Sequence, residues 1–507
     1  MSDGGDPIER TDYVDTFFKE LSPVWLNYVA ALHGVAPRPV DHPFTYIELG
    51  CGFGQSAVTH AAANPNGTFY ACDINPRHVA AAREYARVLG VTNIHIVEAS
   101  FDDLVERDLP DFDFVVLHGV YSWIGDDAKR AVCAFIRRRL KPGGFAYVSY
   151  NCLPGWALEI PLRRLFRELS AVDDDVDAAL TRGLRSLDRL GDSKLGFFTA
   201  HPAMRDLAKS FAQRAPGYLA HEYLGEQWSA YYSVDVADDM RDADLYYLGS
   251  ATLADNHPAL TTGDDAAAAI AALPSARQRT LADDFATNRA FRRDVFVRGP
   301  LRARNPSHLN EVVLARLAPI ASLEARARVP RGVVTFQGAF IEALRRVLAD
   351  GTLAIATIIE RLRDHAANAN EIIRNLTILI AAGELMPAAR VDRYGTFTAG
   401  RAHIDPTASS ALRYAVEHRV TRALPSLLLG NGVDVRPVEA LALIECLAVP
   451  MNAAQLARGI AGRLDREHWL RDADRAQADV VALEAATRVV DILMPMYARL
   501  GLASPRS

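Results

Sequence analysis

Short apolar runs alternate with longer amphipathic segments over the first 150 residues of the chain. Each apolar run has the length of a strand, and helix-like segments separate the runs. Regular alternation of this kind is typical of a parallel, doubly wound α/β sheet. The expected strands are Thr45–Glu48, Thr68–Cys72, Ile94–Val97, Phe112–Leu117 and Phe145–Tyr150.

The segments on either side of this region read as helices. Tyr13–Gly34 is amphipathic at helical spacing, and a helix there is expected either to cover the mouth of a ligand site or to pack on the sheet edge. After Gly155 the alternation stops. Helices are expected over Leu158–Ala171 and Val176–Leu190, and a further helix over Ala276–Phe296.

Three helices and two strand-like pieces follow beyond residue 300. The helices are Phe336–Leu348, Ile355–Leu362 and Ala369–Ala382, and the strand-like pieces lie in Gly383–Ala399. This order is a winged-helix pattern. The third helix carries only Arg374 as a cation, whereas a helix that reads a DNA groove needs several cationic or amide contacts. We therefore expect docking or packing from this module and not DNA binding.

The length of 507 residues predicts several domains. The expected division is an N-terminal helical cap (1–40), an α/β ligand-binding domain (41–155), a helical regulatory domain (156–300), a winged-helix-like domain (301–404) and a C-terminal helical subdomain (405–507). The fold class is thus an α/β, Rossmann-like doubly wound sheet followed by mainly α-helical parts.

Composition narrows the functional classes. Half of the residues are apolar and 23% are charged, and the net charge of −6 argues against a general binder of nucleic acid or anionic membranes. The N-terminus has no apolar signal region, and no window approaches eighteen unbroken apolar residues, so we expect a cytoplasmic protein without a membrane span. The five cysteines show no metal-ligand pairing, and no metal site is expected.

The residues with the most specific chemistry follow the first two strands. The first strand ends at Glu48 and opens into Gly50, Gly52 and Gly54, which permit a tight turn and close approach of the backbone to a ligand. The second strand ends at Asp73, a carboxylate placed to accept hydrogen bonds from the two hydroxyls of a ribose. A nicotinamide-binding fold is the competing interpretation, but it usually shows G-x-G-x-x-G and not G-x-G-x-G.

The order of motifs resembles a class I S-adenosylmethionine-dependent methyltransferase. The motifs are ELGCGFG, the acidic end of the second strand, DFDFV and LKPGG, and they span Tyr46–Asn151. With HGVYSWI, NCLPGW and the aromatic-rich segment 218–249, the chain resembles a bacterial family that joins this domain to a methyltransferase regulatory domain and a winged-helix-like part. Its members with assigned activity, the rickettsial protein-lysine methyltransferases, methylate lysines of outer-membrane proteins. Beyond Pro300 the likeness is one of pattern only.

This resemblance implies S-adenosylmethionine as cofactor and a role for each motif residue. The three glycines would line its amino-acid end and ribose, Glu48 would orient the glycine turn or reach the methionine amine, and Asp73 would hold the ribose diol. Asn75 is a weaker candidate beside Asp73. Ser100 and Phe101 would meet the adenine, with a hydroxyl for N6 and a ring for one face, although many relatives carry Asp at the position of Ser100.

The methyl acceptor is expected beside the end of the fourth strand. His118 is a candidate general base, a donor to the cofactor, or a structural loop residue. Tyr121 and Trp123 are candidates for an aromatic wall around a lysine side chain, with packing of the following helix as the alternative. Asn151 and Trp156 flank the fifth strand and are placed to close the site from the other side. The N-P-P-Y motif of amide and adenine methylation is absent, so neither reaction is expected.

Three functions are consistent with these observations. The first is methylation of lysine side chains on a protein, which rests on the family resemblance; it predicts an open cleft between the two halves of the chain. The second is methylation of a small molecule on O or N. The third is a cofactor-binding regulatory protein whose winged helix contacts DNA or a partner. A homodimer is compatible with all three.

Overall fold

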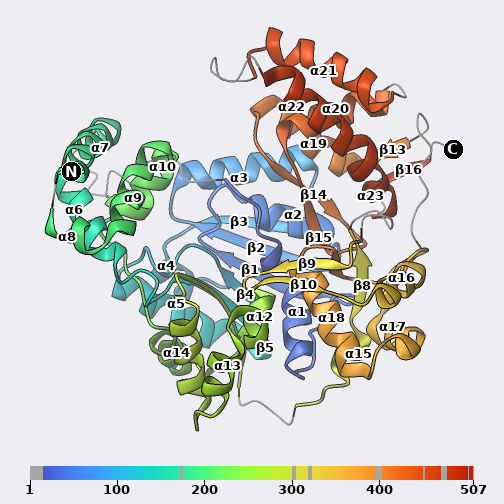
Figure 1. Cartoon of the computed structure of the whole chain (residues 1–507), viewed down its shortest axis with the longest axis horizontal. Coiled ribbons are helices and arrows are strands. Elements are labelled where there is room, and N and C mark those ends of the chain that lie inside the picture. The colour runs from blue at the N-terminus through green and yellow to red at the C-terminus, as the bar shows by residue number, and fades with distance from the viewer. Residues whose placement is uncertain are drawn as a thin grey trace.

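The computed structural model describes residues 15–171, 175–193, 195–299, 304–317, 323–393, 402–448, 451–469, 477–500 and 502–505. Its centre is a seven-stranded sheet with the order β3-β2-β1-β4-β5-β7-β6. Strands β1 to β5 are labelled in the middle of Figure 1. The first five strands are parallel, and β7 runs antiparallel to both β5 and β6. The strands are β1 (Phe44–Leu49), β2 (Gly67–Asp73), β3 (Ile94–Glu98), β4 (Phe112–Leu117), β5 (Leu140–Asn151), β6 (Leu245–Ser250) and β7 (Phe291–Arg298). The predicted Rossmann-like sheet is confirmed.

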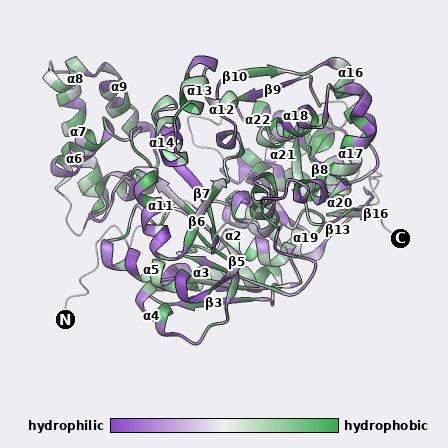
Figure 2. Cartoon of the chain, turned by 90° about the horizontal axis from the view of Figure 1, so that it is seen from below, coloured by the Kyte–Doolittle hydropathy of each residue, from purple (hydrophilic) through white to green (hydrophobic). Residues whose placement is uncertain are grey.

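Helices cover both faces of this sheet. The central strand β4 reads FDFVVL and all six of its residues are buried, as expected for a strand with helices on both sides. Along the surrounding helices, hydrophilic and hydrophobic residues alternate, since each helix buries one face (Figure 2). The helices are α1 (Pro23–Leu32), α2 (Gln55–Ala63), α3 (Pro76–Leu89), α4 (Phe101–Glu106), α5 (Asp126–Arg139), α11 (Ser233–Asp242), α12 (Pro258–Thr261), α13 (Asp264–Ala271) and α14 (Ala276–Ala286).

The strand order reverses direction at one point of the sheet. From β1 the chain proceeds to β2 and β3 on one side and then returns to β4 and β5 on the other side. Ligands of open parallel sheets bind in the crevice outside the carboxyl ends of the strands at such a point. The carboxyl ends of β1 and β4 therefore define where the site is expected.

Two secondary-structure predictions require correction. The helix predicted over Ala276–Phe296 is wrong in its second half, because α14 ends at Ala286 and β7 begins at Phe291. The segment predicted as one helix over Tyr13–Gly34 contains a short 3₁₀ turn and then α1, which begins at Pro23 with Ser22 as its capping residue; residues 13 and 14 lie outside the described range. Proline favours the first turn of a helix and cannot continue one.

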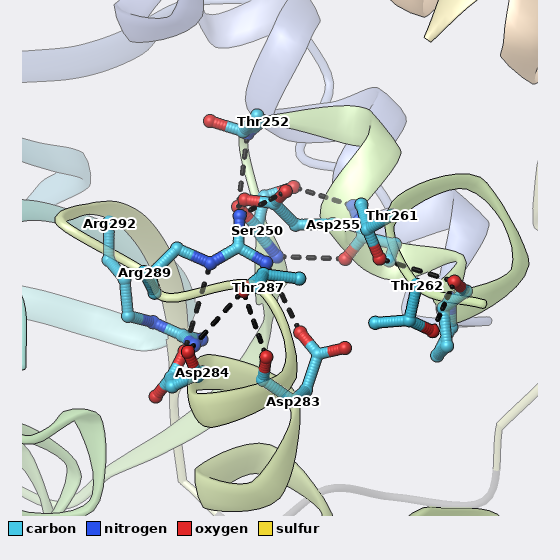
Figure 3. Close-up of polar contacts among 12 residues, drawn as sticks. Ser250, Thr252, Asp255, Thr261, Thr262, Asp283, Asp284, Thr287, Arg289 and Arg292 are labelled. Carbon is cyan, nitrogen blue, oxygen red and sulfur yellow. Dashed lines mark hydrogen bonds and ion pairs between the residues drawn. The ribbon is translucent and has the colours of Figure 1, made fainter. Parts of the chain in front are cut away.

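A buried network of charged residues joins α14 to β7 and to the turn after β6 (Figure 3). Arg289 Nη1 lies 2.5 Å from Asp255 and its Nη2 lies 3.2 Å from Asp283. Arg292 Nη1 lies 2.5 Å from Asp284, which is fully buried. Each buried charge thus has an opposite charge beside it, as burial requires. The network therefore ties β7 to α14 and to the turn after β6.

A separate helical region projects from the sheet between β5 and α11 (Figure 1). It has its own hydrophobic core, which includes Phe166, Phe211 and Tyr223. Trp156 and Trp228 belong to the same core, with their ring centres 4.6 Å apart. Its helices are α6 (Glu159–Ser170), α7 (Val176–Gly191), α8 (Gly196–Ala200), α9 (Pro202–Ser210) and α10 (Pro216–Leu219).

The winged-helix-like part contains the three predicted helices. They are α16 (Gly338–Val347), α17 (Ile355–Leu362) and α18 (Ala369–Ala381), and they follow α15 (His308–Glu311) and the hairpin β9 (Arg326–Val329) and β10 (Gly332–Thr335). Strand β12 (Leu385–Ala388) pairs with β8 (Val313–Arg316), which also pairs with β11 (Leu353–Ala354). The second predicted wing strand falls at residues 394–399, outside the described residues.

The C-terminal part packs against the first helices of the sheet. Its hairpin, β14 (Arg422–Ser426) and β15 (Asn431–Val435), lies on α2, and was not predicted. The other elements are β13 (Ala402–Ile404), α19 (Pro406–His418), α20 (Pro437–Ala448), α21 (Ala453–Arg466), α22 (Ala478–Arg488), α23 (Met494–Arg499) and β16 (Ala503–Pro505). Among the described helices, none has both the length and the apolarity needed to span a bilayer.

Candidate cofactor site and acceptor cavity

The glycine-rich turn after β1 adopts a backbone that only glycine takes readily. Gly50, Gly52 and Gly54 have φ of +72°, +53° and +74°. A Cβ on Gly50 would lie 2.5 Å from Val120 Cγ2, and a Cβ on Gly54 would lie 2.6 Å from Ala82 Cβ. A Cβ on Gly52 would meet nothing within 4 Å. Gly50 and Gly54 are therefore needed for packing, whereas Gly52 faces open space.

Asp73 lies at the end of β2 and contacts this turn directly. Its Oδ2 accepts a hydrogen bond from Gly52 N at 2.8 Å, and its Oδ1 accepts from Asn75 N at 2.9 Å. His78 Nδ1 lies 3.2 Å from the same Oδ1. A carboxylate has about four acceptor positions, so roughly one is left for a ligand. Binding both hydroxyls of a ribose would require one of the three present donors to move.

Glu48 is buried beneath the turn, with 4% of its surface exposed. Its Oε2 is sealed from solvent and has no hydrogen-bond partner among the described residues. Burial, and then the nearby charge of Asp73, raise the pKa of Glu48 to about 8. An unpaired buried carboxyl group of this kind is costly unless a cation or donor approaches it.

The residues predicted to meet the adenine lie at the start of α4. Ser100 is the N-cap of this helix: its Oγ accepts from Asp103 N at 3.1 Å and donates to Asp103 Oδ2 at 2.8 Å. The hydroxyl is thus already used in a capping box. Phe101 is half-buried on the same turn. Asn75 likewise caps α3, with its Oδ1 accepting from Arg77 N at 2.9 Å.

These features fit the cofactor that the sequence resemblance implies. Glu48 would bind the amino group of the cofactor, and Asp73 would bind its ribose. The open space beside Gly52 would let the cofactor approach the protein backbone closely. S-adenosylmethionine supplies a methyl group already activated on a sulfonium. The protein has to bind and orient the donor and the acceptor and to keep the acceptor nitrogen unprotonated.

His118 follows β4 and lies against the N-terminal segment, residues 15–22, which precedes α1. Its Nδ1 lies 2.8 Å from Tyr147 Oη, and its ring is stacked on Phe18 with the ring centres 3.6 Å apart. Burial, with the charge of Arg293 as a smaller cause, lowers the pKa of His118 to about 3. A neutral imidazole with so low a pKa is a weak base at neutral pH, so this environment does not favour the general-base role.

Tyr121 and Trp123 occupy different surroundings. Tyr121 is fully buried in the cluster beneath α5 and α11, and its hydroxyl donates to Asp239 Oδ2 at 2.6 Å. Trp123 is half-buried and packs against the core of the projecting helical region. Both placements favour the packing alternative that the sequence left open.

A cavity of about 530 Å³ lies on the other side of Phe18. The N-terminal segment, β7, the winged-helix-like part, β15 and the C-terminal helices all contribute to its wall. Three aromatic rings and both signs of charge line it, together with aliphatic side chains; the rings and charged groups are Phe17, Phe18, Trp25, Lys19, Arg293, Arg488, Glu20, Glu384 and Asp434.

Sequence reasoning missed two residues of this site. His78 lies in the first turn of α3, five residues after Asp73, a spacing that would have signalled it. Phe18 is a hundred residues from His118, and no local pattern indicates that the two rings stack.

Two family models match the chain. A methyltransferase domain matches residues 47–146, and a predicted methyltransferase regulatory domain matches residues 215–298. The uncharacterized protein sll1526 of Synechocystis sp. is 32% identical over 442 residues, which are 86% of this chain and 87% of that protein. The uncharacterized protein RP789 of Rickettsia prowazekii is 26% identical over 249 residues, 49% of this chain and 45% of that protein.

A solved structure has the same fold over nearly the whole length. PKMT2 from Rickettsia typhi, in complex with AdoHcy, superimposes with a TM-score of 0.69 at 19% identity. The match covers 96% of this chain and 99% of that chain. The likeness therefore extends beyond the sheet to the winged-helix-like and C-terminal parts.

Proposed function

The chain belongs to the class I S-adenosylmethionine-dependent methyltransferases that carry a methyltransferase regulatory domain, and we propose that it methylates lysine side chains of a protein. The observation that carries the proposal is the cavity beside Phe18, which lies between the sheet and the C-terminal parts. A lysine side chain carried by another protein can reach the methyl donor only through a cleft, and an open cleft between the two halves of the chain is what methylation of a protein predicts.

The charges of the cavity favour a cationic acceptor. Two of its cations are already neutralised: Lys19 lies 3.5 Å from Glu20, and Arg488 lies 2.6 Å from Glu439. By contrast, no described residue hydrogen-bonds to the side chain of Glu384 or Asp434. Burial raises the pKa of Glu384, and the nearby charge of Glu324 raises it further. The charge of Lys19 already acts on Asp434, so Glu384, which has no cation beside it among the described residues, is the carboxyl group most open to a lysine side chain.

The aromatic wall suits the stem of the same side chain. The rings of Phe17 and Phe18 accept methylene groups and attract a cation, and Trp25 already has Lys19 Nζ 5.5 Å from its ring centre. Phe18 also lies against His118, so the cavity begins where the methyl donor is expected. A lysine ammonium has a pKa of about 10.4 and must lose a proton to react. Enclosure by apolar rings lowers that pKa and favours the reactive neutral amine.

The similarity to PKMT2 from Rickettsia typhi supports the same proposal through its fold. Because the parts that wall the cavity are included in the match, a similar arrangement of sheet and C-terminal parts is expected in that protein.

The test is transfer of labelled methyl groups from S-adenosylmethionine, followed by mass spectrometry. The purified protein is incubated with cytoplasmic and envelope protein fractions and, separately, with a small-metabolite extract. Increments of one to three methyl groups on lysine residues are expected. Label in metabolites alone would identify a small-molecule methyltransferase, and cofactor binding without transfer would identify a regulatory protein.

A double variant that removes two negative charges tests whether the cavity binds the acceptor. Glu384→Gln with Asp434→Asn should raise KM for the lysine-bearing acceptor and leave AdoHcy affinity unchanged. Glu360→Gln, on the exposed side of α17 and outside the cavity wall, is the matched control. An unchanged KM in the double variant would exclude the cavity as the acceptor site.

A further inference from the structure

A buried carboxyl group orients the side chain of Asn151, the last residue of β5. Glu222 Oε1 lies 2.6 Å from Asn151 Nδ2 and 3.1 Å from Trp228 Nε1. The indole N–H of Trp228 can only donate, so Oε1 acts as an acceptor. Asn151 must therefore present its NH₂ group to Glu222, and its carbonyl oxygen points away from Glu222.

That carbonyl oxygen has no protein partner. Asn151 is 4% exposed, and none of the described residues donates a hydrogen bond to its Oδ1. This oxygen nevertheless keeps some contact with solvent. A nearly buried amide oxygen that can still be reached is prepared for an external N–H donor.

Asn151 lies at the same edge as the cofactor turn. Val120, in the loop after β4, contacts Gly50 of the glycine-rich turn. Two residues later, Ser122 Oγ accepts a hydrogen bond from Asn151 N at 2.8 Å. A contiguous series of contacts thus links the cofactor turn to Asn151 through one loop.

We infer that Asn151 Oδ1 accepts a hydrogen bond from the acceptor amine and that Glu222 positions Asn151 for this contact. The inference rests on the proposed function and names a specificity-determining contact within it. A neutral amine reacts through its lone pair, so its N–H bonds must be directed elsewhere. A fixed carbonyl oxygen that takes one N–H turns the lone pair toward the methyl donor.

The surroundings of Glu222 make this orientation rigid. Glu222 lies in a π-helical turn, Ala220–Leu224, and its backbone oxygen accepts from Arg163 Nε at 2.9 Å. The guanidinium of Arg163 lies over the Trp228 ring, 4.5 Å from its centre. Burial raises the pKa of Glu222 to about 7, and Oε1 accepts hydrogen bonds whether the group is ionised or neutral. A glutamine at this position should therefore keep the hydrogen bond to Asn151.

The decisive measurement is steady-state transfer to Nα-acetyl-lysine methylamide, a probe that presents one lysine side chain. Asn151→Ala should lower kcat at least tenfold, while calorimetry should show AdoHcy affinity changed by no more than about twofold. Asn64→Ala is the matched control: Asn64 is also buried, and its Nδ2 donates to His60 O at 2.8 Å and Gly430 O at 3.0 Å, far from the loop. It should retain kcat.

A second pair of variants separates positioning from folding. Glu222→Gln keeps an acceptor oxygen and should retain kcat, whereas Glu222→Leu should lose at least tenfold. If the wild-type protein labels the probe and Asn151→Ala or Glu222→Leu does so equally well, the inference is overturned and the proposed function stands. If the wild-type protein labels no lysine in probe or protein, the proposed function fails and the inference with it.

Discussion

Replacement of Gly52 by alanine separates the glycine that faces the ligand from glycines that shape the fold. Its φ of +53° disfavours any side chain, and a Cβ there would meet no protein atom within 4 Å. The left-handed backbone costs an alanine about 1–2 kcal/mol. Gly90, at the C-cap of α3, has a φ of +69° and equally open space. The two variants should therefore lose about the same free energy of unfolding in urea.

Cofactor affinity should distinguish these two variants. The added methyl group of Gly52→Ala occupies the space that the ligand requires, so AdoHcy should bind at least tenfold more weakly, which is about 1.4 kcal/mol. Gly90→Ala should bind AdoHcy as the wild-type protein does. Isothermal titration calorimetry on both proteins measures the difference. Equal affinities for the two variants would refute the placement of the ligand over the glycine-rich turn.

Three further substitutions test the site. Because the pKa of Glu48 is raised, the folded protein holds a proton between pH 4.5 and 8 that the unfolded chain has released. The contribution of Glu48 to the free energy of unfolding should therefore fall as pH rises through that window. Glu48→Gln should abolish this pH dependence in urea unfolding. AdoHcy binding at pH 7 should also release a proton from Glu48, which calorimetry in two buffers of different ionisation enthalpy detects; no release would exclude contact with the amino group. Asp73→Ala should weaken AdoHcy binding by about 1.5–3 kcal/mol, and unchanged affinity would remove Asp73 from the ribose site. Tyr121→Ala should lower the free energy of unfolding in urea by about 3–5 kcal/mol, because the ring is fully buried; an unchanged free energy of unfolding would contradict the packing role.

The local predictions succeeded where neighbouring residues decide the structure. The five parallel strands, the turn at Gly50–Gly54 and the helix after it follow from apolar runs and glycines that lie next to one another in the chain. The failure at β7 has the opposite cause. Residues 291–298 read FRRDVFVR, a segment with several charges. They form a strand because β5 and β6 lie on either side and because Asp284 and Asp294 neutralise the buried Arg292.

The candidate site divides in the same way. The sequence indicated Glu48 and Asp73 because each ends a strand beside the glycine-rich turn. It left the roles of His118, Tyr121 and Trp123 open. A residue after a strand can face either the ligand or the core, and only the positions of α5, α11 and the N-terminal segment decide which.

The sequence by itself therefore determined the type of sheet and the glycine-rich turn with its acidic neighbours, since these depend on backbone propensity and on residues within a few positions of each other; its resemblance to a known family indicated the kind of chemistry. Only the tertiary structure decided what surrounds the acceptor. Asn151 meets Glu222 across 71 residues, and Phe18 reaches His118 across a hundred. Such contacts form when distant segments bury their surfaces together, and a linear pattern of residues contains no record of which segments will meet.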